Sequence, residues 1–244
     1  MAQPSASKRW QPILHTFSDE YYFRHRPEEV AWHAEIMSRV SPTPPILVEF
    51  SNDIAEGLTV LMVYSAEGHT HVQTTAILAA FGLNVVDARI IPVSEKSYLN
   101  TYCLLDPDGE PLLEAALLDD IRRRITAALE EPAERMRVNR RTPRQVRVFS
   151  TPVRVTMMPE PANNLTVFEL VAPDRPGLLF EVCQVLESTG VELRNARVAT
   201  IGERAEDVFF VTDHENRPLD ETGRLALKAA LEEALTPSVA RSAV

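Results

Sequence analysis

The feature that most constrains this chain is a long internal repeat. Three landmarks recur in the same order: a Leu-Thr-Val tripeptide, a glycine, and an Ala-Arg pair within a strand-like run. The first copy has them at Leu58-Thr59-Val60, Gly82 and Asp87-Ala88-Arg89-Ile90. The second copy has them at Leu165-Thr166-Val167, Gly190 and Asn195-Ala196-Arg197-Val198. A repeat offset of 107 residues at the tripeptide (165 − 58) and 108 at the glycine (190 − 82) predicts two copies of one small domain, because solenoid units are shorter. Two such copies create an interface where a small ligand can bind.

Composition limits the class of protein. With 45% hydrophobic and 25% charged residues, the chain is typical of a soluble globular protein. The formal charge of −10 disfavours nucleic acid as a partner, since phosphate binding needs clustered Lys and Arg. Apolar runs fall short of the ~20 residues that span a bilayer, and Met1-Ala2-Gln3-Pro4-Ser5 does not begin a secretory signal. We therefore expect a cytoplasmic protein with no membrane contact, and Cys103 and Cys183 as reduced core residues, with a disulfide as the alternative.

Each copy reads as strand-helix-strand-strand-helix. The expected elements are 58–64, 69–81, 83–92, 98–105 and 112–129 in the first copy, and 166–171, 176–188, 191–200, 207–212 and 219–235 in the second. Two helices are expected before the repeat, the first capped by Ser18 and the second beginning at Pro27, and a short strand follows at 46–50. This order is the ferredoxin-like βαββαβ order without its last strand, so we predict an α+β fold.

The missing last strands have two candidate sources. Gln145–Phe149 is expected to complete the first copy. The second copy has no strand candidate after Leu235, and Val153–Met158 is expected to fill the open edge of its sheet. The expected organisation is an N-terminal helical segment at 1–50, a first domain at 51–149 and a second domain at 150–244.

The motif that carries chemistry lies between the first strand and the first helix of the second copy. It reads Ala172-Pro173-Asp174-Arg175-Pro176-Gly177-Leu178-Leu179. Asp174 can cap the helix, Pro176 suits its first turn, and Gly177 allows a ligand to approach the backbone. The amides of Gly177, Leu178 and Leu179 are then expected to face open space at the positive end of the helix dipole, which suits a carboxylate. Asp174 is a nearby anion for an ammonium group, although Asp-x-Pro-Gly is also an ordinary turn that enters a helix.

In this setting the repeat unit resembles an ACT domain. The resemblance extends to the tandem ACT region of the bifunctional PII uridylyltransferase/uridylyl-removing enzyme family. It covers about residues 17–235 and is carried by Tyr22-Phe23-Arg24-His25-Arg26-Pro27-Glu28-Glu29-Val30-Ala31-Trp32-His33, Pro161-Ala162-Asn163-Asn164-Leu165-Thr166-Val167, Glu169-Leu170-Val171-Ala172, the motif above and Ala199-Thr200-Ile201-Gly202-Glu203-Arg204-Ala205-Glu206-Asp207.

The resemblance implies two tandem ACT domains that sense glutamine and control PII uridylylation in nitrogen signalling. Its implied partners are an amino-acid effector, the catalytic domains of such an enzyme or PII, and a second copy in a homodimer. The family's catalytic parts use a Gly-Ser dipeptide with paired aspartates and a His-Asp pair, and neither dipeptide occurs here. The resemblance therefore implies a regulatory chain that is not itself an enzyme and holds no cofactor. Whether the chain is an excised fragment stays open.

Carried over residue by residue, the resemblance places a ligand between the loop of one unit and the second strand of its neighbour. The implied ligand-binding residues are Asp174, Arg175, Pro176, Gly177, Leu178, Leu179, Asn195 and Ala196. Asn195 can pair with a side-chain amide, as glutamine has. The first copy has Ser65-Ala66-Glu67-Gly68-His69-Thr70-His71 without Pro-Gly, and Asp87 in place of Asn195, so Glu67, His69 and Asp87 are weaker candidates.

Several alternatives remain at this point. His69-x-His71 has a spacing that some metal sites use, but without a carboxylate or cysteine cluster we expect no metal. The basic segment Arg135–Arg147 is interpreted as a soluble linker, with an electrostatic docking site for an acidic surface as the alternative. A structural dimerisation or docking module that binds no small molecule is the second functional hypothesis, and catalysis by this chain is the least favoured.

Overall fold

The computed structural model describes residues 17, 19–39, 45–66, 70–92, 97–130, 152–160, 164–175, 177–198, 200–201 and 204–236. The Ser18 cap and the basic segment Arg135–Arg147 lie outside these residues. Among the helices of this described part, none is both long and apolar enough to cross a membrane.

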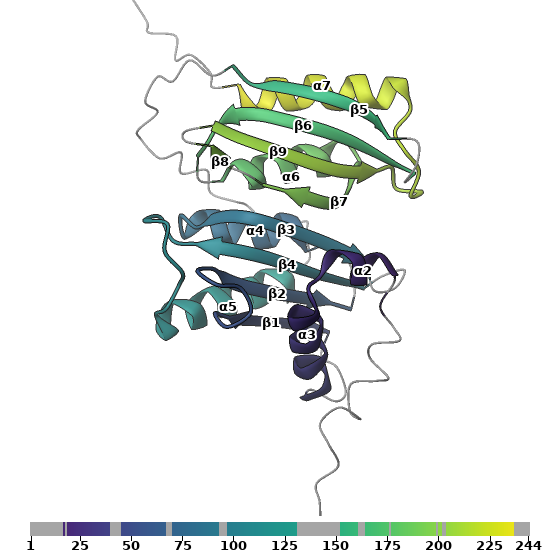
Figure 1. Ribbon diagram of the computed structural model, residues 1–244. Coiled ribbons are helices and arrows are strands. Elements are labelled where there is room, and N and C mark those ends of the chain that lie inside the picture. Colours follow the sequence, from purple (N-terminus) through teal and green to yellow (C-terminus); the bar gives the residue numbers. More distant parts are fainter. Residues whose placement is uncertain are drawn as a thin grey trace, which may run out of the picture.

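Two units of the same architecture make up the body of the molecule (Figure 1). The first comprises β1 (Ile46–Ser51), β2 (Thr59–Ser65), α4 (His71–Ala80), β3 (Asn84–Pro92), β4 (Tyr98–Leu105) and α5 (Ala115–Glu130). The second comprises β5 (Arg154–Glu160), β6 (Leu165–Pro173), α6 (Leu178–Ser188), β7 (Glu192–Arg197), β8 (Thr200–Ile201), β9 (Arg204–Thr212) and α7 (Glu221–Leu235). The strand order is β1-β2-β4-β3 in the first and β5-β6-β9-β7 in the second, with β8 paired to β9. This confirms the predicted tandem ferredoxin-like α+β fold.

Equivalent residues make the same contacts in both units. The amide of Leu112 donates to Thr59 Oγ1 at 2.8 Å, and the amide of Leu219, 107 residues later (219 − 112), donates to Thr166 Oγ1 at 2.8 Å. The turns that follow β4 and β9 also match, since Asp106 Oδ1 and Asp213 Oδ1 each accept from two backbone amides. The sequence repeat is therefore a structural repeat at the level of single hydrogen bonds.

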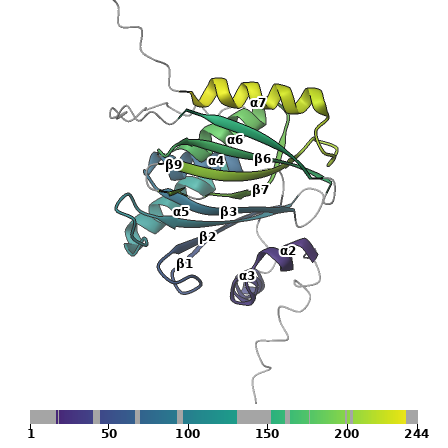
Figure 2. The same ribbon diagram turned by 45° about the horizontal axis from the view of Figure 1, so that its top comes forward.

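The two units join through their second strands. β3 and β7 pair antiparallel, and the register places Ala88 opposite Ala196. These two alanines are equivalent in the repeat (196 − 88 = 108), so a local two-fold axis passes near this pair. One continuous sheet results, and α4 packs beside α6 on the face that α5 and α7 also cover (Figure 2).

The edge strands confirm one expectation and correct another. β5 pairs with β6, as expected for Val153–Met158. The equivalent place beside β2 is taken by β1, so the prediction that Gln145–Phe149 fills it is wrong; that segment lies outside the described residues. Hairpin pairing of β1 with β2 closes only the loop 52–58, which costs less chain entropy than closing a loop of roughly 80 residues. Because β1 belongs to the sheet of the first unit, the domain boundary proposed at residues 50/51 falls within a paired strand.

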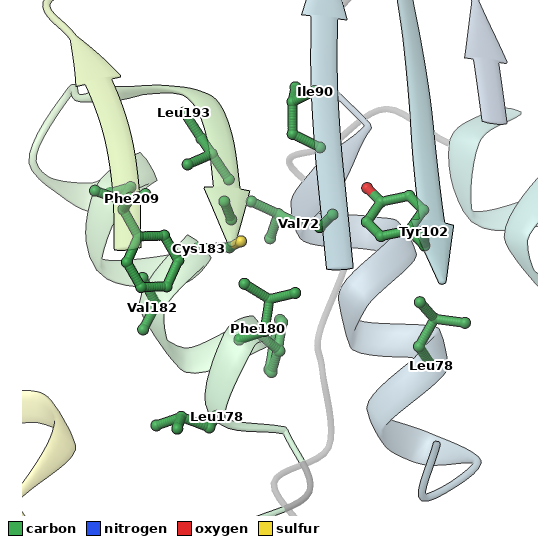
Figure 3. Packing of buried hydrophobic residues seen from close by; sticks show 14 of the residues in the cluster. Val72, Leu78, Ile90, Tyr102, Leu178, Phe180, Val182, Cys183, Leu193 and Phe209 are labelled. Atoms are coloured by element: carbon green, nitrogen blue, oxygen red, sulfur yellow. The ribbon is translucent and has the colours of Figure 1, made fainter. Parts of the chain in front are cut away.

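A shared hydrophobic core lies between the sheet and its four covering helices. Figure 3 shows Val72 of α4 near Phe180 and Cys183 of α6, and Leu78 of α4 on the side of Tyr102 of β4. In the second unit the rings of Phe168 and Phe209 stack with their centroids 4.8 Å apart. Cys103 and Cys183 are free and buried, and burial raises the pKa of the Cys183 thiol to about 12. The core therefore crosses the boundary between the units.

The opposite face of the first unit's sheet is covered by α2 (Asp19–Arg24) and α3 (Pro27–Arg39) (Figure 2). α3 begins at Pro27 as predicted, and Glu29 in its first turn accepts from the amide of Arg26 at 2.8 Å. A second, smaller cluster of buried side chains forms beneath these helices, and it includes Tyr21, Met37 and Ile91.

Candidate ligand-binding site

A cavity of about 50 Å³ lies where the two units meet. Residues 174–175 and 177–180 of the second unit form one wall. The opposite wall comes from the first unit, from Thr75 and Ala79 on α4 and residues 83–86 at the start of β3. The cavity therefore lies between the loop region of the second unit and the beginning of the second strand of the first unit.

The loop turns into α6 at Gly177. Gly177 has a positive φ of 86° and occupies the N-cap position of α6, where its carbonyl accepts from the amide of Glu181 at 3.0 Å. The expectation that Asp174 caps this helix is therefore corrected, because the helix begins at Leu178 and a residue without a side chain stands at its N-cap. A Cβ placed at Gly177 would lie 3.5 Å from that of Ala79 in α4. The glycine is therefore needed for the left-handed turn, whereas a Cβ there would make only an ordinary van der Waals contact with α4.

The helix amides only partly follow the prediction. The amide of Leu178 donates to the carbonyl of Arg175 at 3.2 Å, so it does not face open space. The amides of Leu179 and Phe180 belong to the first turn of α6, where helical geometry supplies no acceptor from the same helix. The positive end of the α6 dipole adds to their attraction for an anion. The cavity therefore keeps a place suited to a carboxylate, with fewer amides than expected.

Arg175 holds the loop in position. Its guanidinium contacts Glu181 Oε2 of α6 at 2.5 Å and the carbonyl of Leu235, the last residue of α7, at 3.3 Å. These contacts attach the Arg175 side chain to α6 and α7 of its own unit. Arg175 also lines the cavity. Asp174 is exposed and lines the cavity, whereas Leu178 and Leu179 are buried. Pro176 lies outside the described residues.

The remaining predicted residues lie away from this cavity. Asn195 is buried opposite Arg89 in the β3–β7 pairing, and Ala196 lies at the local two-fold axis. The loop of the second unit faces β3 of the first unit. Asn195 lies on β7, and the local axis places β7 on the side of the first unit's loop. Asp87 is half-buried and forms an ion pair with Arg89 Nε at 2.8 Å, and burial raises the pKa of its carboxyl group although Arg89 opposes the shift. Glu67 and His69 lie outside the described residues.

The His69-x-His71 spacing is only partly described, because His69 lies outside the described residues. His71 is the first residue of α4 and is buried. Within the described ranges, no cluster of three or more His, Cys, Asp or Glu residues could hold a metal ion.

Sequence reasoning missed Asp207, a buried carboxylate in the cavity wall. Asp207 lies on β9 and is 1% exposed. The alternate residues Ala205, Phe209 and Val211 of the same strand face the core, so the period of two places Asp207 on the core side as well. The sequence does contain an indication of Asp207, because an aspartate at one of a series of alternating core positions is unusual without a functional or structural reason.

Replacing Gly177 with alanine is expected to lower the free energy of unfolding by about 1–2 kcal/mol, because a side chain at positive φ is strained. Gly57→Ala is the matched control, since Gly57 has a φ of 72° and open space around it. Urea unfolding should show similar losses for both variants. A loss at Gly57 with none at Gly177 would contradict the left-handed turn at the cavity.

The comparisons with known proteins agree with this geometry. Residues 166–231 match the ACT domain family. The chain is 36% identical over 89% of its length to the bifunctional uridylyltransferase/uridylyl-removing enzyme of Pseudomonas entomophila and covers 24% of that protein. The corresponding enzymes of Stutzerimonas stutzeri and Methylococcus capsulatus are 37% and 36% identical over 83% and 96% of the chain, which covers 23% and 26% of them. The chain thus spans about a quarter of the length of these relatives.

Among solved structures, aspartate kinase from Synechocystis aligns with 74% of this chain and 28% of that chain, at 18% identity and a TM-score of 0.38. That likeness is too weak to carry an argument. Residues 166–231 form an ACT domain, and the chain is homologous over most of its length to part of the bifunctional uridylyltransferase/uridylyl-removing enzymes.

Proposed function

We propose that this chain is the amino-acid-sensing regulatory module of a uridylyltransferase/uridylyl-removing enzyme, and that glutamine binding between its two units controls modification of PII. The observation that carries the proposal is the cavity between loop 174–180 and the first unit, in a chain related to these enzymes. The catalytic parts of such an enzyme, or PII itself, would be the partner that responds.

The chemistry of the cavity suits an α-amino acid. The first turn of α6 offers amides and a positive dipole end for the carboxylate. Asp174 and Asp207 supply negative charge for the ammonium group on the same cavity wall. Leu83 and Val85 of the first unit supply apolar surface for the aliphatic part of the side chain.

Ligand binding at this place can act on the arrangement of the units. Because the two walls belong to different units, a ligand that contacts both binds one arrangement of β3 and β7 better than another. The shift can be no larger than the difference between those two affinities. Ligand binding would therefore be transmitted as a small change in how β3 and β7 are arranged relative to each other.

Calorimetric titration of the whole chain with L-glutamine, together with thermal unfolding, tests the proposal. We expect measurable heat and a stabilisation of about 2.7 kcal/mol at a ligand concentration of 100 times Kd. D-Glutamine should bind more weakly, since the carboxylate and ammonium sites fix the stereochemistry. Absence of both heat and stabilisation at millimolar L-glutamine would contradict the proposal and favour a structural docking module.

A cavity-filling variant locates the binding. Ala79→Leu introduces a larger side chain into the wall contributed by α4 and should weaken glutamine binding at least tenfold. Ala80→Leu is the matched control, because Ala80 is the next residue of α4 and is exposed. Equal weakening by both variants, or by neither, would place the ligand elsewhere.

A further inference from the structure

The internal repeat allows the two halves of the junction to be compared position by position. Asn100 on β4 pairs with Val63, and Asp207 on β9 pairs with Leu170. Both offsets are 107 (207 − 100 and 170 − 63), so Asn100 and Asp207 occupy equivalent places. The N-cap residues of α4 and α6, Thr70 and Gly177, are also 107 residues apart.

In the first unit these two places are occupied by side chains that bond to each other. Asn100 Nδ2 donates to Thr70 Oγ1 at 2.6 Å, and both residues are buried. The hydroxyl at the N-cap and the amide on the strand are therefore partners of each other at the beginning of α4. An amino acid could enter there only if this buried hydrogen bond were broken.

In the second unit both partners are changed. Gly177 places no side chain at the N-cap, and the strand residue is a carboxylate instead of an amide. An ionised aspartate offers only acceptors, whereas Asn100 uses its side-chain donor. The wall of the cavity therefore presents the buried carboxyl group of Asp207 at the position that Asn100 occupies in the first unit.

We propose that Asp207 binds the ammonium group of the amino-acid ligand, and that the Thr70–Asn100 contact closes the equivalent site, so that each chain holds one amino acid. This inference rests on the proposed function and adds the residue that selects the ligand's amino group. The ammonium would form a charge-assisted hydrogen bond with the carboxylate in a nearly water-free place, where such bonds are strong. The carboxylate of the same ligand would lie toward the first turn of α6.

The test is the nearly isosteric variant Asp207→Asn, which gives the second unit the strand residue of the first. Calorimetry should show a 10- to 100-fold loss of glutamine affinity. Glu206→Gln is the matched control, since Glu206 is the adjacent residue on β9, forms an exposed ion pair with Arg204 and does not line the cavity. Wild-type protein should bind one glutamine per chain.

A second measurement keeps the inference testable if Asp207→Asn does not fold. The wild-type chain should bind the α-hydroxy analogue of glutamine, which lacks the ammonium group, at least tenfold more weakly than glutamine. Equal affinity for both ligands, unchanged glutamine affinity in Asp207→Asn, or a stoichiometry of two would overturn the inference while leaving the sensing function intact. No glutamine binding by the wild-type chain would instead contradict the proposed function itself.

Discussion

Replacing Arg89 with methionine is expected to lower the free energy of unfolding by about 3–5 kcal/mol, the largest effect of any single change considered for this chain. Arg89 forms a bidentate pair with Glu29, with Nη1 to Oε2 at 2.8 Å and Nη2 to Oε1 at 2.6 Å. The Glu29 side chain is only 4% exposed. Without the guanidinium, α3 would carry a buried carboxylate that has lost its cation.

Urea unfolding monitored by circular dichroism measures this loss. Arg122→Met is the control, because Arg122 forms ion pairs with Asp119 and Glu49 that are about one-third or more exposed and should contribute less than about 1 kcal/mol. The double variant Glu29→Met, Arg89→Met should be more stable than Arg89→Met alone, since it removes the stranded charge. Similar losses for Arg89→Met and Arg122→Met would show that the buried pair does not anchor α3.

Acidification is expected to destabilise the chain between pH 6.5 and 4 by about 3 kcal/mol through His25 alone. Burial, with the nearby Arg89 charge, lowers the pKa of His25 to about 4, and burial lowers the pKa of His33 well below its usual value. Both imidazoles are therefore neutral in the folded chain at pH 6, whereas the unfolded chain takes up protons there. Stability is present above pH 6.5 and is lost as the pH falls.

The contacts of the two histidines fit their neutral forms. Tyr21 Oη lies 2.7 Å from His33 Nδ1, and burial raises the pKa of Tyr21, so the phenol stays protonated and can donate to a neutral imidazole. His25 Nδ1 lies 3.0 Å from the carbonyl of Tyr21, and its Nε2 lies 3.2 Å from Thr101 Oγ1. The charged neighbours are Arg89, Arg24 and Glu29, and the two cations disfavour a further proton.

Unfolding free energies at pH 7, 6 and 5 test this dependence. The variant His25→Gln should reduce the slope of stability against pH, while His214→Gln, at an exposed position, should not. If stability depended on pH as steeply in His25→Gln as in the unaltered chain, His25 would not be the source of the acid sensitivity.

The fold was largely predictable because the repeat reports the same structure twice. The glycines at 82 and 190, the Leu-Thr-Val tripeptides and the β5 pairing all fall where the pattern placed them. The choice between 46–50 and 145–149 for the edge beside β2 was not predictable from local pattern, since a strand was expected in both runs. Chain connectivity decided it, because the nearer strand forms a hairpin with the shorter loop.

Only the wall of the candidate site that the Asp174-Arg175-Pro176-Gly177 motif adjoins could be predicted from the sequence. Residues 174–175 and 177–180 line a cavity wall, but the opposite wall depends on how β3 and β7 pair. That pairing places Asn84–Val86 opposite the loop and Asn195 on the other side of the local axis. The Arg89–Glu29 pair joins residues 60 positions apart, and the pattern around either residue does not indicate the other.

A crystal structure of the whole chain grown with L-glutamine tests the central claim most directly. The account predicts one glutamine per chain, lying between loop 174–180 and the beginning of β3, with its carboxylate toward the first turn of α6 and its ammonium within hydrogen-bond distance of Asp207. Glutamine bound beside Asn195, or a cavity left without ligand at saturating glutamine, would contradict it.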